Sequence, residues 1–183
     1  MTNSEQEIAL SELHQRHPGL TAPLGGTFEE AASVCFARFH SPPVEITVDF
    51  DAREEKRLID YSVPSMRVCN AHANEIDATE AGAYGVSLAV LENVKGLVAV
   101  KRAETLTGAD WYVMPQGAES EDLEECIRLE VSGISAGDSK AVKQRLRKKI
   151  EQTRRGASNL PAVAVVVGFQ VREVAISELE DKK

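Results

Sequence analysis

The sequence predicts an α/β (α+β) protein in which a mixed central β-sheet is flanked by helices. Three observations predict this class: a capped helix rich in small residues, three strand-like segments directly after it, and a basic helix followed by a continuously apolar strand. These segments are residues 74–96, then 97–104, 109–115 and 126–134, then 139–155 and 162–169. Successive antiparallel strands followed by a helical crossover to a further strand produce a mixed sheet.

The first helix of this core has end signals on both sides. Asp77 and Glu80 form an Asp-x-x-Glu pattern that predicts the start of the helix, and Gly96 stands where a C-terminal cap belongs. The apolar run 162–169 is typical of a strand covered on both faces. Residues 171–179 are expected to add a last strand or a strand and helix tail.

The chain of 183 residues, 43% of them hydrophobic, is expected to form one compact domain with two parts. Residues 1–73 are predicted to be an N-terminal extension, carrying a helix and a β-hairpin, that packs on a core of residues 74–183. The polar residues 1–27 contain chain-breaking Pro and Gly, so we expect them to pack loosely.

The helix and hairpin of the extension follow from local patterns. Thr27, with Glu30 three residues on, has the capping-box pattern of a helix start. Residues 44–50 alternate apolar and polar side chains as a half-buried strand does. The charged residues 51–57 are expected to turn the chain, and residues 58–63 to return as the second strand.

Composition excludes several classes of protein. No stretch approaches the roughly 18 consecutive apolar residues of a membrane span, and the polar, acidic start lacks the features of a signal peptide, which together predict a cytoplasmic protein without membrane contact. The widely spaced Cys35, Cys69 and Cys126 predict neither a zinc site nor disulfides, and the four histidines are expected in loops and on the surface. A net charge of −8 argues against indiscriminate coating of nucleic acid, although residues 140–155 hold eight of the 21 Lys and Arg residues.

Two strand carboxylates are the candidate metal ligands. Successive side chains of a strand point to opposite faces, so Asp110 shares a face with Tyr112, and Glu130 shares one with Ser132. If the two strands pair with these faces on the same side, the two carboxylates come within a few ångströms and suit Mg²⁺ or Mn²⁺. The alternative is that both acids lie on a solvated sheet face without a metal.

The order of elements, together with these acids, resembles the restriction-endonuclease-like (PD-(D/E)XK) superfamily over roughly residues 74–170. The resemblance implies a core of order α-β-β-β-α-β, in which Asp110 and Glu130 bind the metal and Glu80, from the first helix, assists. Glu80 has a second interpretation, as a residue of the helix cap.

The sequence departs from this family where the family has lysine. Ser132 stands two residues after Glu130, and its hydroxyl cannot replace an ammonium that orients or activates water. Lys101, on the preceding strand, and Lys143 or Gln144, on the following helix, are the candidates to supply the missing group.

Three functional hypotheses follow. The first is a Mg²⁺- or Mn²⁺-dependent endonuclease acting on DNA. The second is a catalytically inactive nuclease-fold module that binds nucleic acid, a protein partner or a second copy of the chain as a homodimer. The third is an unrelated α/β protein in which both acids lie on the surface.

The basic helix has two interpretations. Its charged residues are either a solvated face or a nucleic-acid contact, through Lys140, Lys143, Arg147 and Arg154. Trp111 and Tyr112 are either base-stacking residues or buried strand aromatics.

Overall fold

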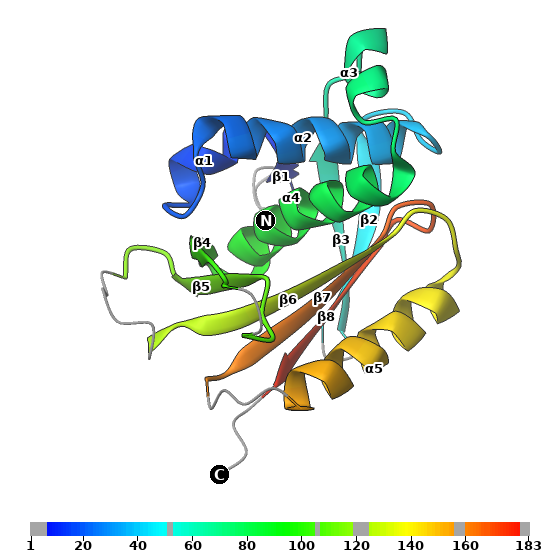
Figure 1. Ribbon diagram of the computed structural model, residues 1–183. Coiled ribbons are helices and arrows are strands. Elements are labelled where there is room, and N and C mark those ends of the chain that lie inside the picture. The colour runs from blue at the N-terminus through cyan, green and yellow to red at the C-terminus, as the bar shows by residue number, and fades with distance from the viewer. Residues whose placement is uncertain (1–6, 51–52, 105–106, 119–124, 156–159, 180–183) are drawn as a thin grey trace.

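The computed structural model describes residues 7–50, 53–104, 107–118, 125–155 and 160–179 (Figure 1). Within these residues, eight strands form one mixed sheet in the order β1-β3-β2-β8-β7-β6-β5-β4. The strands are β1 (Glu7–Ala9), β2 (Val44–Phe50), β3 (Arg53–Asp60), β4 (Leu97–Arg102), β5 (Trp111–Pro115), β6 (Ile127–Ile134), β7 (Ala162–Gly168) and β8 (Glu173–Leu179). The predicted α/β class, a mixed sheet flanked by helices, is confirmed.

Helices cover both faces of this sheet (Figure 1). The described helices are α1 (Leu13–Arg16), α2 (Ala22–Ala37), α3 (Met66–Ala71), α4 (Glu75–Lys95) and α5 (Ser139–Arg155). Strand β7 separates two sets of contacts. Val165 belongs to the main core with α4 and α2, whereas Val166 packs against Val142 of α5. Because neighbouring strand residues point to opposite faces, α4 and α5 lie on opposite sides of the sheet. No helix in the described ranges is long and apolar enough to cross a membrane.

The strands around the two candidate carboxylates have defined directions. β4, β5 and β6 are antiparallel neighbours, while β6 and β7 are parallel and are joined through α5. Parallel neighbours need a crossover connection, and α5 supplies it. From α4 to β7 the chain therefore reads helix, three strands, helix, strand.

The N-terminal hairpin extends the same sheet. β2 pairs with β3 antiparallel and with β8 parallel, so the hairpin continues the sheet edge. The prediction that residues 51–57 form a turn is wrong for Arg53–Arg57, which belong to β3, while residues 51 and 52 lie outside the described residues. Residues 53–57 are all charged and mostly exposed. They therefore lack the alternation of apolar and polar residues from which a strand is predicted. A division of the chain at residue 73 stays a prediction.

Two helix starts differ from the sequence prediction. α2 begins at Ala22, ahead of the predicted cap at Thr27, because Pro23 is favourable in a first turn and the Thr27 hydroxyl instead donates to the Pro23 carbonyl within the helix. α4 begins after Asn74, whose side-chain oxygen accepts from the amides of Ile76 and Asp77. At the other end of α4, Gly96 has φ +63° and is the predicted C-terminal cap.

The first part of the chain is anchored by a buried histidine, so the expected loose packing and surface position are wrong there. His17 is fully buried, and its Nδ1 accepts from the Ala99 amide at 2.9 Å, which places the ring proton on Nε2. That nitrogen lies 3.2 Å from Glu92 Oε2, and Arg16 Nε lies 2.9 Å from both Glu92 oxygens. The segment thereby covers the edge of β4, where the Gly19 amide also donates to the Ala99 carbonyl.

We expect Glu92→Gln to lower the free energy of unfolding by about 1 kcal/mol at neutral pH, because charge-assisted hydrogen bonds are replaced by neutral ones. Burial alone raises the pKa of Glu92, but hydrogen bonds from His17 and Arg16 and the Arg16 charge outweigh it and lower the pKa. The contribution is therefore present above the unfolded pKa, about 4.3, and is lost as pH falls through the folded value. Urea unfolding at neutral and acid pH measures it. Glu54→Gln, on the exposed face of β3, is the control, and an unchanged acid decline in Glu92→Gln contradicts the prediction.

Candidate active site

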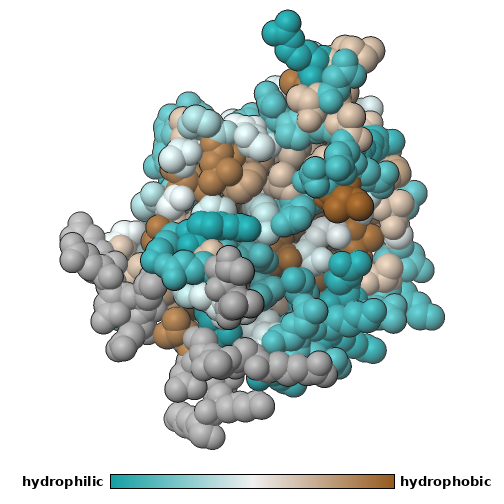
Figure 2. Space-filling view, viewed as in Figure 1, coloured by the Kyte–Doolittle hydropathy of each residue, from teal (hydrophilic) through white to brown (hydrophobic). Residues whose placement is uncertain are grey.

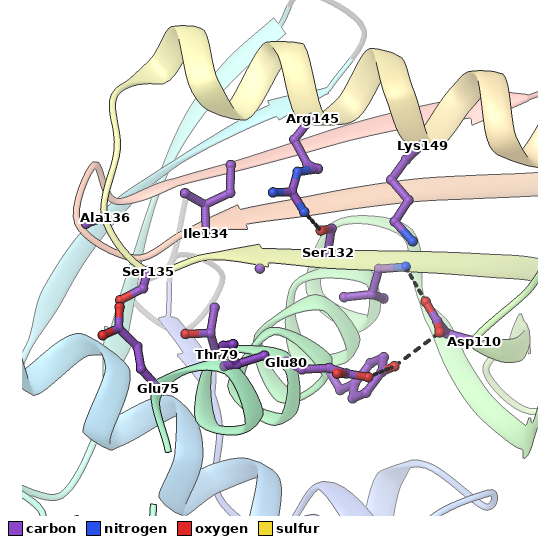
Figure 3. Close-up of a pocket in the computed structure, with 14 residues that line it drawn as sticks. Glu75, Thr79, Glu80, Asp110, Ser132, Ile134, Ser135, Ala136, Arg145 and Lys149 are labelled. Atoms are coloured by element: carbon purple, nitrogen blue, oxygen red, sulfur yellow. Dashed lines mark hydrogen bonds between the residues drawn. The ribbon is translucent and has the colours of Figure 1, made fainter. Parts of the chain in front are cut away.

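A cavity of about 700 Å³ opens where the first half of α4, β6 and α5 meet (Figure 3). This volume lies in the range of ligand-binding clefts. Polar side chains from all three elements and from the start of β5 line it. They are Glu75, Thr79, Glu80, Tyr84, Asp110, Ser132, Ser135, Arg145 and Lys149.

The structure brings Asp110 and Glu130 together. Trp111 pairs with Leu129 in the antiparallel β5–β6 ladder, and this is the last pair before Asp110. The two carboxylates are close enough for the Asp110 charge to raise the pKa of Glu130. Asp110 is fixed there because its amide donates to the Leu129 carbonyl and its Oδ2 accepts from the Val131 amide, both at 2.8 Å.

Lys149 of α5 contacts Glu130 from the face of the sheet opposite to α4. Its Nζ lies 2.9 Å from Glu130 Oε2, and the two side chains are 21% and 12% exposed. Burial raises the pKa of Glu130 and the Asp110 charge adds to this, while the hydrogen bond and charge of Lys149 lower it; the net pKa lies above the usual value. Lys149 lines the cavity and Glu130 does not, so the ammonium covers this carboxylate on the cavity side.

Tyr84 connects Asp110 to Glu80. The phenol oxygen lies 2.9 Å from Glu80 Oε1 and 3.1 Å from Asp110 Oδ1, and it accepts from Arg102 Nη2 at 3.1 Å. Burial is the largest cause of a strongly raised pKa for Tyr84, so the hydroxyl keeps its proton and donates a hydrogen bond to one of the two carboxylates at a time. Glu80 therefore contacts Asp110 through a hydroxyl, and it is not the helix cap, which is Asn74.

Ser132 holds a second basic side chain of α5. Arg145 Nη1 donates to Ser132 Oγ at 3.1 Å, one helical turn before Lys149. The position that lacks the expected lysine therefore faces two cations from the next helix. Both point from α5 toward β6 in the close-up view (Figure 3).

The two lysines predicted for this role contact other residues. Lys101 pairs with Glu104 at 3.3 Å, and Lys143 pairs with Asp49 of β2 at 3.8 Å. Neither lines the cavity. Gln144 is exposed on α5 and also lies outside the lining. On a helix, residues 143 and 144 point away from the face that carries Arg145 and Lys149 toward β6.

The basic residues predicted to contact nucleic acid lie on the outer surface of α5. Lys140, Lys143, Arg147 and Arg154 are all exposed. In the space-filling view, hydrophilic side chains cover this helix (Figure 2). Trp111 is fully buried and Tyr112 is 8% exposed, so stacking of either ring on a base is excluded in this structure.

Sequence reasoning missed Lys149, Arg145 and Tyr84. A signal for the first two was present, because the apolar stripe of α5 contains Val142 and Leu146, and residues three positions away border such a stripe. A cation beside the stripe lies at the rim of the sheet contact. No comparable signal marks Tyr84, which lies in a row of buried helix residues.

The donor chemistry of the site fits a hard divalent cation held mainly by water. Within the described ranges, no three His, Cys, Asp or Glu side chains converge closely enough to hold a metal ion. Mg²⁺ commonly uses only one or two carboxylates and keeps several waters. Asp110 and Glu130 are the two strand carboxylates here, and each carboxylate oxygen that accepts one hydrogen bond retains a further lone pair. Their oxygen atoms are of the kind that Mg²⁺ or Mn²⁺ prefers, and of the two carboxylates Asp110 is the one that lines the cavity.

Comparisons of the chain with protein-family models, with curated proteins and with solved structures find no match. The function is therefore argued from the geometry of the cavity.

Proposed function

We propose that the protein is a metal-dependent nuclease that hydrolyses phosphodiester bonds of DNA. In this proposal α4, β4, β5, β6, α5 and β7 form a restriction-endonuclease-like core of order α-β-β-β-α-β. The element order supports it, as do the directions of the strands and the position of Asp110, directly before β5 and hydrogen-bonded to the strand that carries Glu130.

The observation that carries the proposal is the contact between Lys149 Nζ and Glu130 Oε2 at 2.9 Å. A nuclease site of this type needs two carboxylates and a cationic group at one point. The strand position expected to carry the lysine holds Ser132, and α5 supplies an ammonium at the same carboxylate from another direction. Both Lys149 and Asp110 line a cavity wide enough for a substrate group.

Each residue has a role that follows from its contacts. Asp110 and Glu130 hold Mg²⁺ or Mn²⁺, which when bound stabilises the charge that develops on the phosphate and lowers the pKa of a water. Lys149 orients the attacking water beside Glu130 and limits the repulsion between the two carboxylates. Tyr84 fixes the Asp110 carboxylate, and Glu80 accepts the hydrogen bond of Tyr84 when Asp110 does not.

The alternative of an inactive nuclease-fold module was motivated by the serine at position 132 and by the net charge of −8. The ammonium of Lys149 supplies the positive charge that is missing at position 132, which favours catalysis, while the net charge is unaffected. The module hypothesis remains testable, because it predicts binding of nucleic acid or of a partner without cleavage under any metal condition.

The test measures cleavage of plasmid, linear and single-stranded DNA with Mg²⁺, with Mn²⁺ and with chelator, alongside calorimetric titration of Mn²⁺. We expect cleavage only with metal, and Asp110→Asn to weaken the apparent Mn²⁺ affinity at least about 10-fold, since even residues that support metal ligands cost that much. Asp60→Asn, an exposed aspartate at the end of β3, is the matched control. Absence of cleavage of every substrate, or Mn²⁺ binding that Asp110→Asn leaves unchanged, overturns the proposal.

A further inference from the structure

Among the residues that the structure describes, Arg145 is a cation without an acidic partner. Its one side-chain hydrogen bond goes to a neutral hydroxyl, Ser132 Oγ, and no carboxylate of the described residues lies within ion-pair distance of it. Lys143 and Lys149 on the same helix are each paired with an acid. The exposed guanidinium therefore keeps its full charge and most of its N–H donors for a ligand.

The charged residues around Arg145 limit where in the cavity an anionic ligand can bind. The cavity is lined by the carboxylates Glu75, Glu80 and Asp110, which repel an anion, and by the cations Arg145 and Lys149. Because Lys149 is held by Glu130, Arg145 is the lining cation available to a negatively charged group. A planar guanidinium forms paired hydrogen bonds with phosphate oxygens, a geometry that an ammonium does not offer.

The position of Arg145 also relates it to the two carboxylates. Arg145 and Lys149 are four residues apart on one face of α5, so both reach β6 within one helical turn. Figure 3 shows the Arg145 side chain directed to Ser132 across the cavity from α4, with Lys149 beside it on the Asp110 side. A phosphate group next to the carboxylates thus has the guanidinium as its neighbour.

We propose that Arg145 binds a backbone phosphate of the nucleic-acid substrate and that Ser132 holds the guanidinium in place for it. This inference rests on the proposed nuclease function. It assigns separate tasks to the two cations of α5: Lys149 acts at Glu130, and Arg145 grips the substrate. Ser132, which departs from the expected lysine, becomes the anchor of the substrate-binding group.

The test is fluorescence anisotropy with short labelled duplexes of two unrelated sequences, and their single strands, in Ca²⁺ buffer over a range of salt. We expect Arg145→Ala to weaken binding about 10-fold for both sequences and to reduce the slope of log K against log salt by about one, as loss of one phosphate contact does. Arg145→Lys restores the slope because a lysine still contacts phosphate as a point charge. Ser132→Ala weakens binding less than Arg145→Ala.

Lys148→Ala is the matched control, because Lys148 is exposed on the same helix and lies outside the cavity lining. If Arg145→Ala binds DNA no more weakly than Lys148→Ala, or if the wild type binds no DNA, the inference is overturned. Binding that depends on Arg145 in a protein that never cleaves DNA upholds the phosphate site and overturns the proposed nuclease function. If the wild type cleaves DNA but Arg145→Ala has an unchanged dissociation constant, the nuclease function is upheld and the phosphate site at Arg145 is overturned.

Discussion

The Lys149→Met variant is expected to lose metal-dependent DNA cleavage by about 10³-fold in kcat, the contribution of a positioned acid–base group. Methionine keeps the length and the apolar stem of the side chain and removes the ammonium that contacts Glu130 at 2.9 Å. The loss falls on kcat because Lys149 acts at the carboxylates, while Arg145 binds the substrate phosphate. Steady-state cleavage rates over a range of DNA concentrations separate kcat from KM.

The same substitution changes stability in a way that identifies its cause. Without Lys149 a buried Glu130 is left charged and unpaired at high pH, which costs about 1–3 kcal/mol. Its pKa, already above the usual value because of burial, rises further when the lowering effect of Lys149 is removed. A carboxyl with a raised folded pKa favours the unfolded state as pH rises, so the variant regains stability as pH falls through that pKa.

A conservative variant and a control variant test whether the loss is caused by the Lys149 ammonium. Lys149→Arg retains the positive charge and the pairing, so we expect wild-type stability with reduced activity. Lys148→Met removes an exposed lysine of the same helix and is expected to change neither. Wild-type cleavage by a folded Lys149→Met variant would exclude Lys149 from catalysis and with it the main support for a nuclease.

The sheet and helices that carry the site were predictable because their patterns are local. Gly96 ends α4 where a left-handed cap is required, and the continuous apolar run of β7 reflects burial on both faces. The start of α2 was not predictable from Thr27, because proline in an earlier turn had already fixed the helix. The burial of His17 depends on Glu92 and Ala99, which are far away in the sequence.

The candidate site also contains both residues whose positions were predictable from the sequence and residues whose positions were not. Alternation along a strand is a local property, and it places Glu130 and Ser132 on the face of the sheet that α5 covers. Asp110 departs from it, because its carboxylate contacts Tyr84 of α4 and the Val131 amide. Lys149 is different, since its position depends on how α5 crosses β6, which the helix pattern does not specify. A narrow stripe of Val142 and Leu146 predicts which face is buried, but not which neighbouring cation reaches a carboxylate.

Gly133→Ala is expected to lower the free energy of unfolding by about 2–3 kcal/mol, because it overpacks the contact between β6 and α4. A Cβ at this position would lie 2.6 Å from the Thr79 carbonyl oxygen and 3.1 Å from Ala83 Cβ. A backbone oxygen in the second turn of α4 cannot move unless the helix moves with it. Chemical unfolding at neutral pH measures the change.

The effect extends to the site because α4 also carries Glu80 and Tyr84. Displacing the helix from β6 lengthens the 3.1 Å contact between the Tyr84 hydroxyl and Asp110, so we expect weaker Mn²⁺ binding even in the fraction that stays folded. Gly26→Ala is the matched control: no atom lies within 4 Å of its Cβ position inside α2, so alanine is expected to stabilise by about 0.5–1 kcal/mol. If Gly133→Ala lowers the free energy of unfolding and Gly26→Ala raises it, the cost arises from the contact between α4 and β6. A stabilised Gly133→Ala variant would show that this contact does not hold α4 against β6.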